Sequence, residues 1–139
     1  MSLRHPDALV AALAGTLEAH ISSRSGLKGL AMKAGFSTLR SAKPDIASRA
    51  VRMLLPEIGK ALDPLYAEFT RSQSTDFGAF LQGHGERAAS LVIAAVDARL
   101  AQASSAPAKA IYKRFRGQAG EELQQLLPTM GSVLSTHIG

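Results

Sequence analysis

Apolar residues recur along the chain at the spacing of helix faces, and no long segment alternates apolar and polar residues one by one. Ala and Leu are abundant whereas Val, Ile and Thr are sparse, a composition that favours helices over strands. The chain is therefore predicted to be all-α. The predicted helices run over about 6–21, 27–42, 44–69, 77–81, 86–103, 108–116 and 121–137.

The second predicted helix is apolar around most of its circumference. Leu27, Leu30, Ala31 and Ala34 share one face, and Met32, Phe36 and Leu39 extend it. Polar positions are confined to a narrow stripe formed by Lys33, Ser37 and Arg40. A helix with so little polar surface is expected to be buried on two sides.

Two boxes of the same pattern, Leu54–Leu62 and Leu126–Leu134, each place a proline inside a helical rhythm. Proline removes one backbone hydrogen bond and presses its ring on the preceding turn. The boxes therefore predict either kinked helices or pairs of short helices that meet before Pro56 and Pro128. In each box the leucines are expected in the core, and the glycine that follows is expected to allow a close helix approach.

The recurrence of these boxes predicts an internal duplication. Lys33–Arg40 matches Lys109–Arg116 in its Lys-Ala pair, aromatic residue and final arginine, and the boxes keep the same order in both halves. We expect one domain over 1–139, with repeats 8–62 and 90–134 and a connector 63–89. The predicted architecture is a six- to seven-helix bundle of two three-helix halves related by a pseudo-twofold axis.

Polar residues and glycines mark the ends of the shorter helices. Thr75 or Asp76 is expected to cap the helix that begins near Phe77. The segment Gly83–Gly85 is expected to interrupt the chain before the next helix. The aromatic residue Phe80, with Phe77 and Leu81, is expected to be partly exposed in this short element and to favour self-association.

Several motifs together resemble a known family. They are Ser25–Leu27, Lys33-Ala34, Leu54–Leu62, Asp63-Pro64 followed by Tyr66, and Asp76–Leu81. On these motifs the chain resembles an actinobacterial family of small all-helical proteins of unknown function. The resemblance implies a bacterial, intracellular, all-helical protein, and it implies no activity, cofactor or site residue.

Charge is unevenly distributed. The chain has a net charge of +5 and a pI near 10.0, and residues 24–52 hold seven basic residues, Lys28 among them, against the single acid Asp45. Residues 99–116 hold five basic residues and no acid. The candidate anion-binding residues are Lys33, Arg40, Lys109, Lys113, Arg114 and Arg116. The partner could be nucleic-acid backbone, lipid headgroups or an acidic protein, and the alternative is a solvated surface.

No motif of catalysis or metal binding is present in the sequence. There is no cysteine, no two of the four histidines are spaced four residues apart, and Gly83–Ala88 fits a dinucleotide fingerprint only without its strand. We expect no cofactor, no metal and no enzymatic activity. The chain is predicted to be a helical binding or scaffolding module in the cytoplasm. No apolar run reaches the length of a membrane span.

A second hypothesis is that an apolar small molecule or lipid binds between the two halves. A bundle with kinked helices can leave an apolar pocket. The candidate lining residues are Met32, Phe36, Met53, Phe115 and Met130. The alternative use of such residues is core packing.

Overall fold

The computed structural model describes residues 3–104 and 106–138, without the side chain of Lys28. The predicted place of Lys28 in a basic cluster and the two ends of the predicted domain 1–139 therefore lie outside the described residues. Within this part of the chain seven α-helices and one short 3-10 helix follow one another, which confirms the all-α prediction. They are α1 (Pro6–Ser23), α2 (Gly26–Ala42), α3 (Ile46–Arg71), α4 (Phe77–Gly83), α5 (Gly85–Ala101), α6 (Ala106–Phe115), η1 (Arg116–Gln118) and α7 (Ala119–Ser135).

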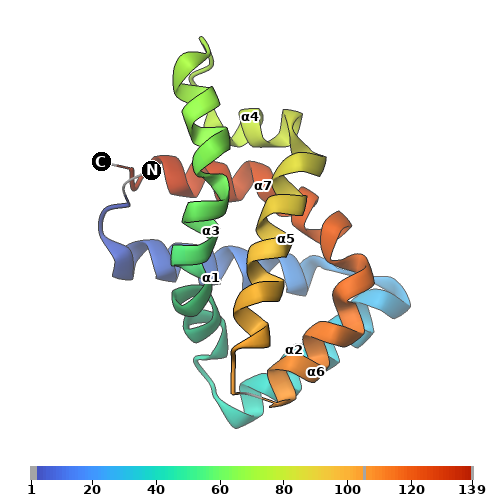
Figure 1. Ribbon diagram of the computed structural model, residues 1–139. Coiled ribbons are helices and arrows are strands. Elements are labelled where there is room, and N and C mark those ends of the chain that lie inside the picture. Colours follow the sequence, from blue (N-terminus) through green and yellow to red (C-terminus); the bar gives the residue numbers. More distant parts are fainter. Residues whose placement is uncertain (1–2, 105, 139) are drawn as a thin grey trace.

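Five helices, α1, α3, α4, α5 and α7, form the body of the molecule. In Figure 1, α3 and α5 run side by side and cross α1 and α7; α3 is in contact with α1, and α5 is in contact with α7. The α4 helix packs against α7. The core between these helices includes Leu9, Leu13, Leu55, Leu62, Leu65, Phe77, Leu81, Val92, Leu127 and Leu134. Each of these leucines contributes roughly 1.5–3 kcal/mol by leaving water.

The helices with internal prolines are continuous. The α3 helix runs past Pro56 and Pro64 without a break, and α7 runs past Pro128. The alternative of two short helices meeting at Leu55 is therefore wrong. A proline costs a helix about 3 kcal/mol, but the buried residues Leu55, Leu62 and Leu65 keep α3 packed in the core on both sides of its prolines.

The glycines of the two Leu-Leu-Pro boxes differ in their surroundings. A Cβ on Gly131 would lie 2.6 Å from the Cα of Gly78 on α4, so the predicted close approach is confirmed at this position. A Cβ on Gly59 would meet only Leu3 Cδ1 at 3.9 Å, so the same prediction is wrong there. The second box thus forms the contact that seats α4 on α7.

The ends of α4 match their prediction. The Asp76 side chain accepts a hydrogen bond from the Ala79 N–H at 3.1 Å and caps the helix. His84 separates α4 from α5. The predicted partial exposure is wrong for Phe77, which is 1% exposed, and for Leu81, which is fully buried, whereas Phe80 is half-buried. Phe77 and Leu81 are therefore not available for self-association through this element.

The α2 helix is not buried on two sides. It contacts α1 and α6, and Leu27 and Leu30 on its predicted core face are 87% and 62% exposed. Periodicity predicted an apolar face but could not tell whether another element of the chain covers it. Figure 1 shows α2 and α6 lying together below the crossing helices, at the edge of the molecule.

The internal duplication stays a prediction. The helix contacts occur in the pairs that a twofold relation of the repeats 8–62 and 90–134 requires: α1 with α3 and α5 with α7, α1 with α7 and α5 with α3, and α2 with α6. The chain ends also meet, since Leu3 and Ile138 form a β-bridge.

Candidate anion-binding surface

The helices α2 and α6 form a layer outside the core, which we call the basic layer (residues 26–42 and 106–115). Gly35 lets them approach, because a Cβ there would lie 3.3 Å from the Phe115 ring and 3.4 Å from Ile111 Cγ2. No described side chain of either helix is in the buried core. The layer therefore adds little to the hydrophobic core while presenting most of its surface to solvent.

Positive charge is concentrated in the basic layer. Its two helices hold six of the sixteen Lys and Arg residues and none of the eleven Asp and Glu residues. The remainder of the chain consequently holds ten basic residues against eleven acidic ones. The net positive charge of the protein thus comes from these two helices, which occupy a small part of its length.

A groove of about 250 Å³ between α1 and α2 brings two of the predicted cations together. Lys33 and Arg40 line it, and the Arg40 guanidinium lies 5.9 Å from the centre of the Phe36 ring. The remaining lining residues are Glu18, Ile21, Ser22 and Ser37. Two cations and two hydroxyls are donors that suit a phosphate or carboxylate group, and Glu18 is the single carboxylate among them.

The predicted cations of residues 108–116, which form α6 and the first residue of η1, divide into two groups. Lys113 and Arg114 are exposed, and the Arg114 guanidinium lies 5.7 Å from the Phe115 ring centre. Lys109 is also exposed, and its Nζ lies 3.5 Å from the carbonyl oxygen of Ala101. Arg116, in contrast, is engaged by Asp97 of α5. The surface available to an anion therefore comprises Lys33, Arg40, Lys109, Lys113 and Arg114.

Arg116 fixes the end of α6 to α5. Its Nε and Nη2 donate to Asp97 at 2.9 Å each, and the Tyr112 hydroxyl donates to Asp97 at 2.7 Å. The Arg116 hydrogen bonds, followed by the Tyr112 hydroxyl, hold the pKa of Asp97 below its usual range. The pKa of Asp97 is lower in the folded state than in the unfolded state. The Arg116–Asp97 pair therefore stabilises the fold at pH values above the pKa that Asp97 has in the unfolded chain. This contribution is lost as the pH falls through the folded pKa.

The pKa of Tyr112 is raised, first by burial and then by its hydrogen bond to the Asp97 carboxylate. The resulting stabilisation is present below the usual tyrosine pKa of about 10 and declines as the pH rises above it. In an alkaline titration followed by ultraviolet absorbance, Tyr112→Phe should remove a component that ionises well above that value. Asp97→Asn should move this component to lower pH. If Tyr112→Phe removes a component centred near pH 10, the description of this contact is wrong.

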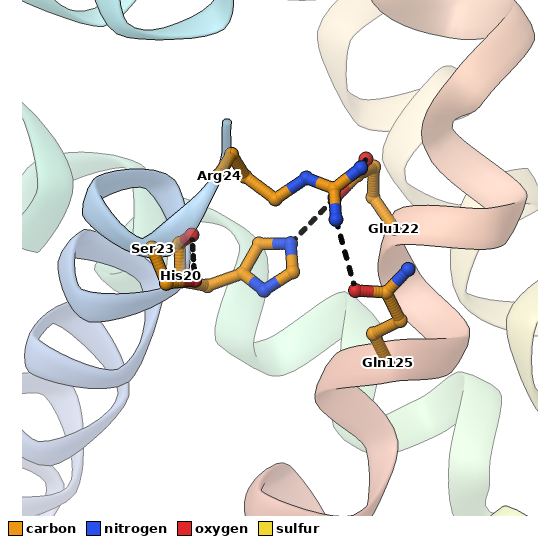
Figure 2. A network of polar contacts seen from close by, with 5 residues as sticks. All are labelled: His20, Ser23, Arg24, Glu122 and Gln125. Carbon is orange, nitrogen blue, oxygen red and sulfur yellow. Dashed lines mark hydrogen bonds and ion pairs between the residues drawn. The ribbon is translucent and has the colours of Figure 1, made fainter. Parts of the chain in front are cut away.

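A second polar network joins the α1–α2 junction to α7 (Figure 2). The Glu122 carboxylate receives the Arg24 Nη2 at 2.8 Å and lies 2.6 Å from His20 Nε2. Arg24 Nη1 also donates to Gln125 at 3.3 Å, and the Ser23 hydroxyl donates to the backbone carbonyl of His20 at 2.7 Å. The Glu122 side chain is 13% exposed, so these contacts are shielded from water.

This network has residue types used in acid–base chemistry but lacks the geometry of a nucleophile–base pair. The Ser23 hydroxyl points to the backbone of His20 and not to its ring, and Glu122 is already paired with Arg24. An open groove of about 490 Å³ beside His20 runs between α1 and α7. The network acts as a clamp that fixes the start of α2 on the body.

Replacing Glu122 with glutamine should lower the free energy of unfolding by about 1–2 kcal/mol, because Arg24 loses a partly shielded charged partner. The exposed neighbour Glu121 is the matched control, since both residues lie in the first turn of α7. Glu121→Gln should change the free energy by less than about 0.5 kcal/mol in chemical denaturation. Equal losses for the two variants would mean that only the helix dipole is involved.

The candidate pocket residues are not brought to one cavity. Met130 is 8% exposed and belongs to the core, and Phe36 lines the groove between α1 and α2. Met32, Met53 and Phe115 are half-buried and line neither of the two grooves described above. Phe115 instead packs near Gly35, where α2 meets α6.

Sequence reasoning missed the residues that hold the basic layer in place. Glu122 lies 102 residues from its partner His20, and Asp97 lies 19 residues from Arg116. No local pattern predicts such pairs, because each joins helices that meet only in the fold. The twin basic segments were the only signal in the sequence that pointed to this part of the molecule.

No metal centre or membrane span is found in the part of the chain that the structure describes. No group of three or more His, Asp and Glu residues there is placed to hold a metal ion. None of the helices in residues 3–104 and 106–138 is both long and apolar enough to cross a bilayer.

Residues 2–138 match the model of a family of unknown function, DUF6918. No curated protein and no solved structure matches the chain.

Proposed function

The chain belongs to DUF6918, a family of unknown function, and we propose that it is a non-catalytic binding module whose basic layer binds an anionic partner. The observation that carries the proposal is the segregation of charge. All the net positive charge lies on two helices that contain no acidic residue and that contribute no described side chain to the buried core.

Two features of the basic layer support binding over a merely solvated surface. First, no carboxylate within α2 or α6 neutralises the cations, although surface cations of the body pair with acids, as Arg52 does with Asp7 and Arg87 with Glu68. Second, Lys33 and Arg40 share a groove instead of pointing apart. Clustered cations, with Glu18 as the one carboxylate in their groove, produce a local positive potential that attracts anions.

The proposed setting is the bacterial cytoplasm. The module would act there by bringing its anionic partner to the bundle without changing it chemically. Binding of an apolar small molecule between the two halves is not proposed, because the five candidate lining residues are spread over the core, the groove and the α2–α6 contact.

The test compares two triple variants of equal charge change. Lys33→Gln/Arg40→Gln/Arg114→Gln removes exposed cations of the basic layer. The matched control Lys60→Gln/Arg71→Gln/Arg87→Gln removes exposed cations of α3 and α5. Binding is measured to heparin and to anionic vesicles at about 50 mM and 200 mM salt.

Wild-type protein should bind both probes at the lower salt concentration, and binding should weaken steeply at the higher one. With each cation contributing about 1 kcal/mol near an anionic surface, the layer variant should lose roughly 100-fold in affinity. The control should stay within about threefold of wild type. Absence of binding to both probes at low salt, or an equal loss in both variants, would refute the proposed function.

A further inference from the structure

An apolar stripe on α2 faces solvent beside the cations of the basic layer. Leu27, Leu30 and Ala34 follow one another at i, i+3 and i+7, so they lie on one face of the helix, and all three are exposed. Leu27 at 87% and Leu30 at 62% are exposed to a degree that few large apolar side chains reach. The stripe has the pattern of a buried helix face, yet no described element of the chain covers it.

The cations adjoin this stripe around the helix. At 100° per residue, Lys33 lies about 60° from Leu30 around the helix axis, and Arg40 lies about 20° beyond Lys33. Lys113 and Arg114 are exposed on the neighbouring α6. The same surface thus offers apolar side chains at its centre and a cluster of cations at its flank.

We infer that the anionic partner of the basic layer is the surface of a lipid bilayer, with α2 lying in the interface and Leu27 and Leu30 inserted among the acyl chains. This inference rests on the proposed function. An interfacial helix combines an apolar face, which leaves water, with cations that meet the lipid phosphates. The leucines of α2 then contact the acyl chains, and its cations contact the lipid phosphates.

Other partners would contact either the leucines or the cations of this surface, but not both. Nucleic acid would pair with Lys33 and Arg40 but would leave the leucines in water, because phosphate contacts are polar. A second copy of the chain would cover the leucines but would bring six further cations and no acid against the first six. The cations of two copies that face each other in this way repel.

The polar clamp at the start of α2 is part of the inferred arrangement. Arg24, held by Glu122, directly precedes the residues Ser25 and Gly26 with which α2 begins. A Cβ on Gly29 would lie 2.7 Å from the Arg24 backbone carbon, so α2 is closely packed on the clamped junction. The direction in which Leu27 and Leu30 face is consequently fixed relative to the body.

The first experiment measures flotation of the full chain with phosphatidylcholine vesicles, with and without phosphatidylglycerol. Wild-type protein should float only with the anionic vesicles. Leu27→Ser/Leu30→Ser should reduce this partitioning at least about tenfold, because the apolar contribution is lost. Its affinity for heparin should stay within about twofold of wild type. Unchanged flotation of the variant would overturn the inference.

The second experiment places a tryptophan in the stripe, since the natural chain has none. The fluorescence of Leu27→Trp should shift to the blue with anionic vesicles and not with heparin. The matched control Gln82→Trp, at an exposed position of α4, should show no shift with either probe. A shift for neither protein, while heparin still binds, would overturn the lipid surface as partner and leave the proposed function intact.

Analytical sedimentation of the wild type and of Leu27→Ser/Leu30→Ser tests whether a second copy of the chain covers the stripe. Wild type should sediment as the same species as Leu27→Ser/Leu30→Ser. If wild type is a dimer that the variant dissolves, with no change in flotation, the stripe is covered by a second copy and the inference is wrong. If neither heparin nor anionic vesicles bind wild type at low salt, the proposed function fails together with the inference.

Discussion

Replacing Gly78 with alanine should lower the free energy of unfolding by about 3 kcal/mol. A Cβ at this position would overlap the carbonyl oxygen of Pro128 and would lie 2.8 Å from Ser132 Oγ. Both groups belong to α7, and the carbonyl is part of its backbone, so it cannot rotate away as a flexible side chain would. The α4 helix would have to move off α7.

Chemical denaturation followed by circular dichroism measures this effect. Gly131→Ala should give a comparable loss, because its Cβ would lie 2.6 Å from the Gly78 Cα on the other side of the same contact. Gly15→Ala in the exposed middle of α1 is the control, since a Cβ there meets nothing within 4 Å. That control should gain about 0.5–1 kcal/mol from helix propensity. An unchanged free energy of unfolding for Gly78→Ala would contradict the close contact of α4 with α7.

Phe77→Ala is the second large effect, with an expected loss of about 3–5 kcal/mol. The Phe77 side chain is 1% exposed and packs among three other aromatic rings. Its ring centre lies 5.1 Å from that of Phe69, 5.4 Å from that of Tyr66 and 6.5 Å from that of Phe80. Truncation would leave a cavity between α3 and α4 that these rings are too constrained to fill.

The control for this prediction is Phe36→Ala on α2. Phe36 is half-buried and lies in the basic layer, so its truncation should lower the free energy of unfolding by about 1 kcal/mol or less. The two variants have the same change in chemistry and differ only in where the ring lies. Similar losses would mean that α2 belongs to the core, and the division into a body and a basic layer would be wrong.

Much of the fold follows from local sequence patterns. Helices were predictable from apolar periodicity, the α4 cap from Asp76, and the break before α5 from the segment Gly83–Gly85. These features depend on residues within a few positions of one another. The same holds for Pro56 and Pro128, where local rules allowed two outcomes and the burial of α3 and α7 selected the continuous helix.

The placement of faces could not be predicted in the same way. The apolar residues of α2 and of α4 have similar patterns, yet Phe77 is buried and Leu27 is exposed. Periodicity states that a face is apolar, whereas its burial depends on which helix packs against it. Gly78 and Gly131, 53 positions apart in the sequence, allow α4 to pack closely on α7, whereas none of the described helices packs on the outer side of α2.

The sequence predicted which residue types form the candidate site, but not which of the cations remain available to an anion. Both basic segments were evident from composition, but Arg116 could not be distinguished from Lys113 or Arg114 without its partner Asp97. The clamp of Arg24, His20 and Glu122 had no local signal. Long-range ion pairs therefore decide which cations remain available to an anion.

Hydrogen–deuterium exchange with and without anionic vesicles can show whether the basic layer is the binding surface and the other helices form a body that does not take part in binding. Vesicles containing phosphatidylglycerol should slow exchange in residues 26–42 and 106–115 and leave α3, α4 and α7 unchanged. Phosphatidylcholine vesicles should have no effect. Slower exchange confined to the body, with the basic layer unchanged, would mean that the basic layer is not the binding surface.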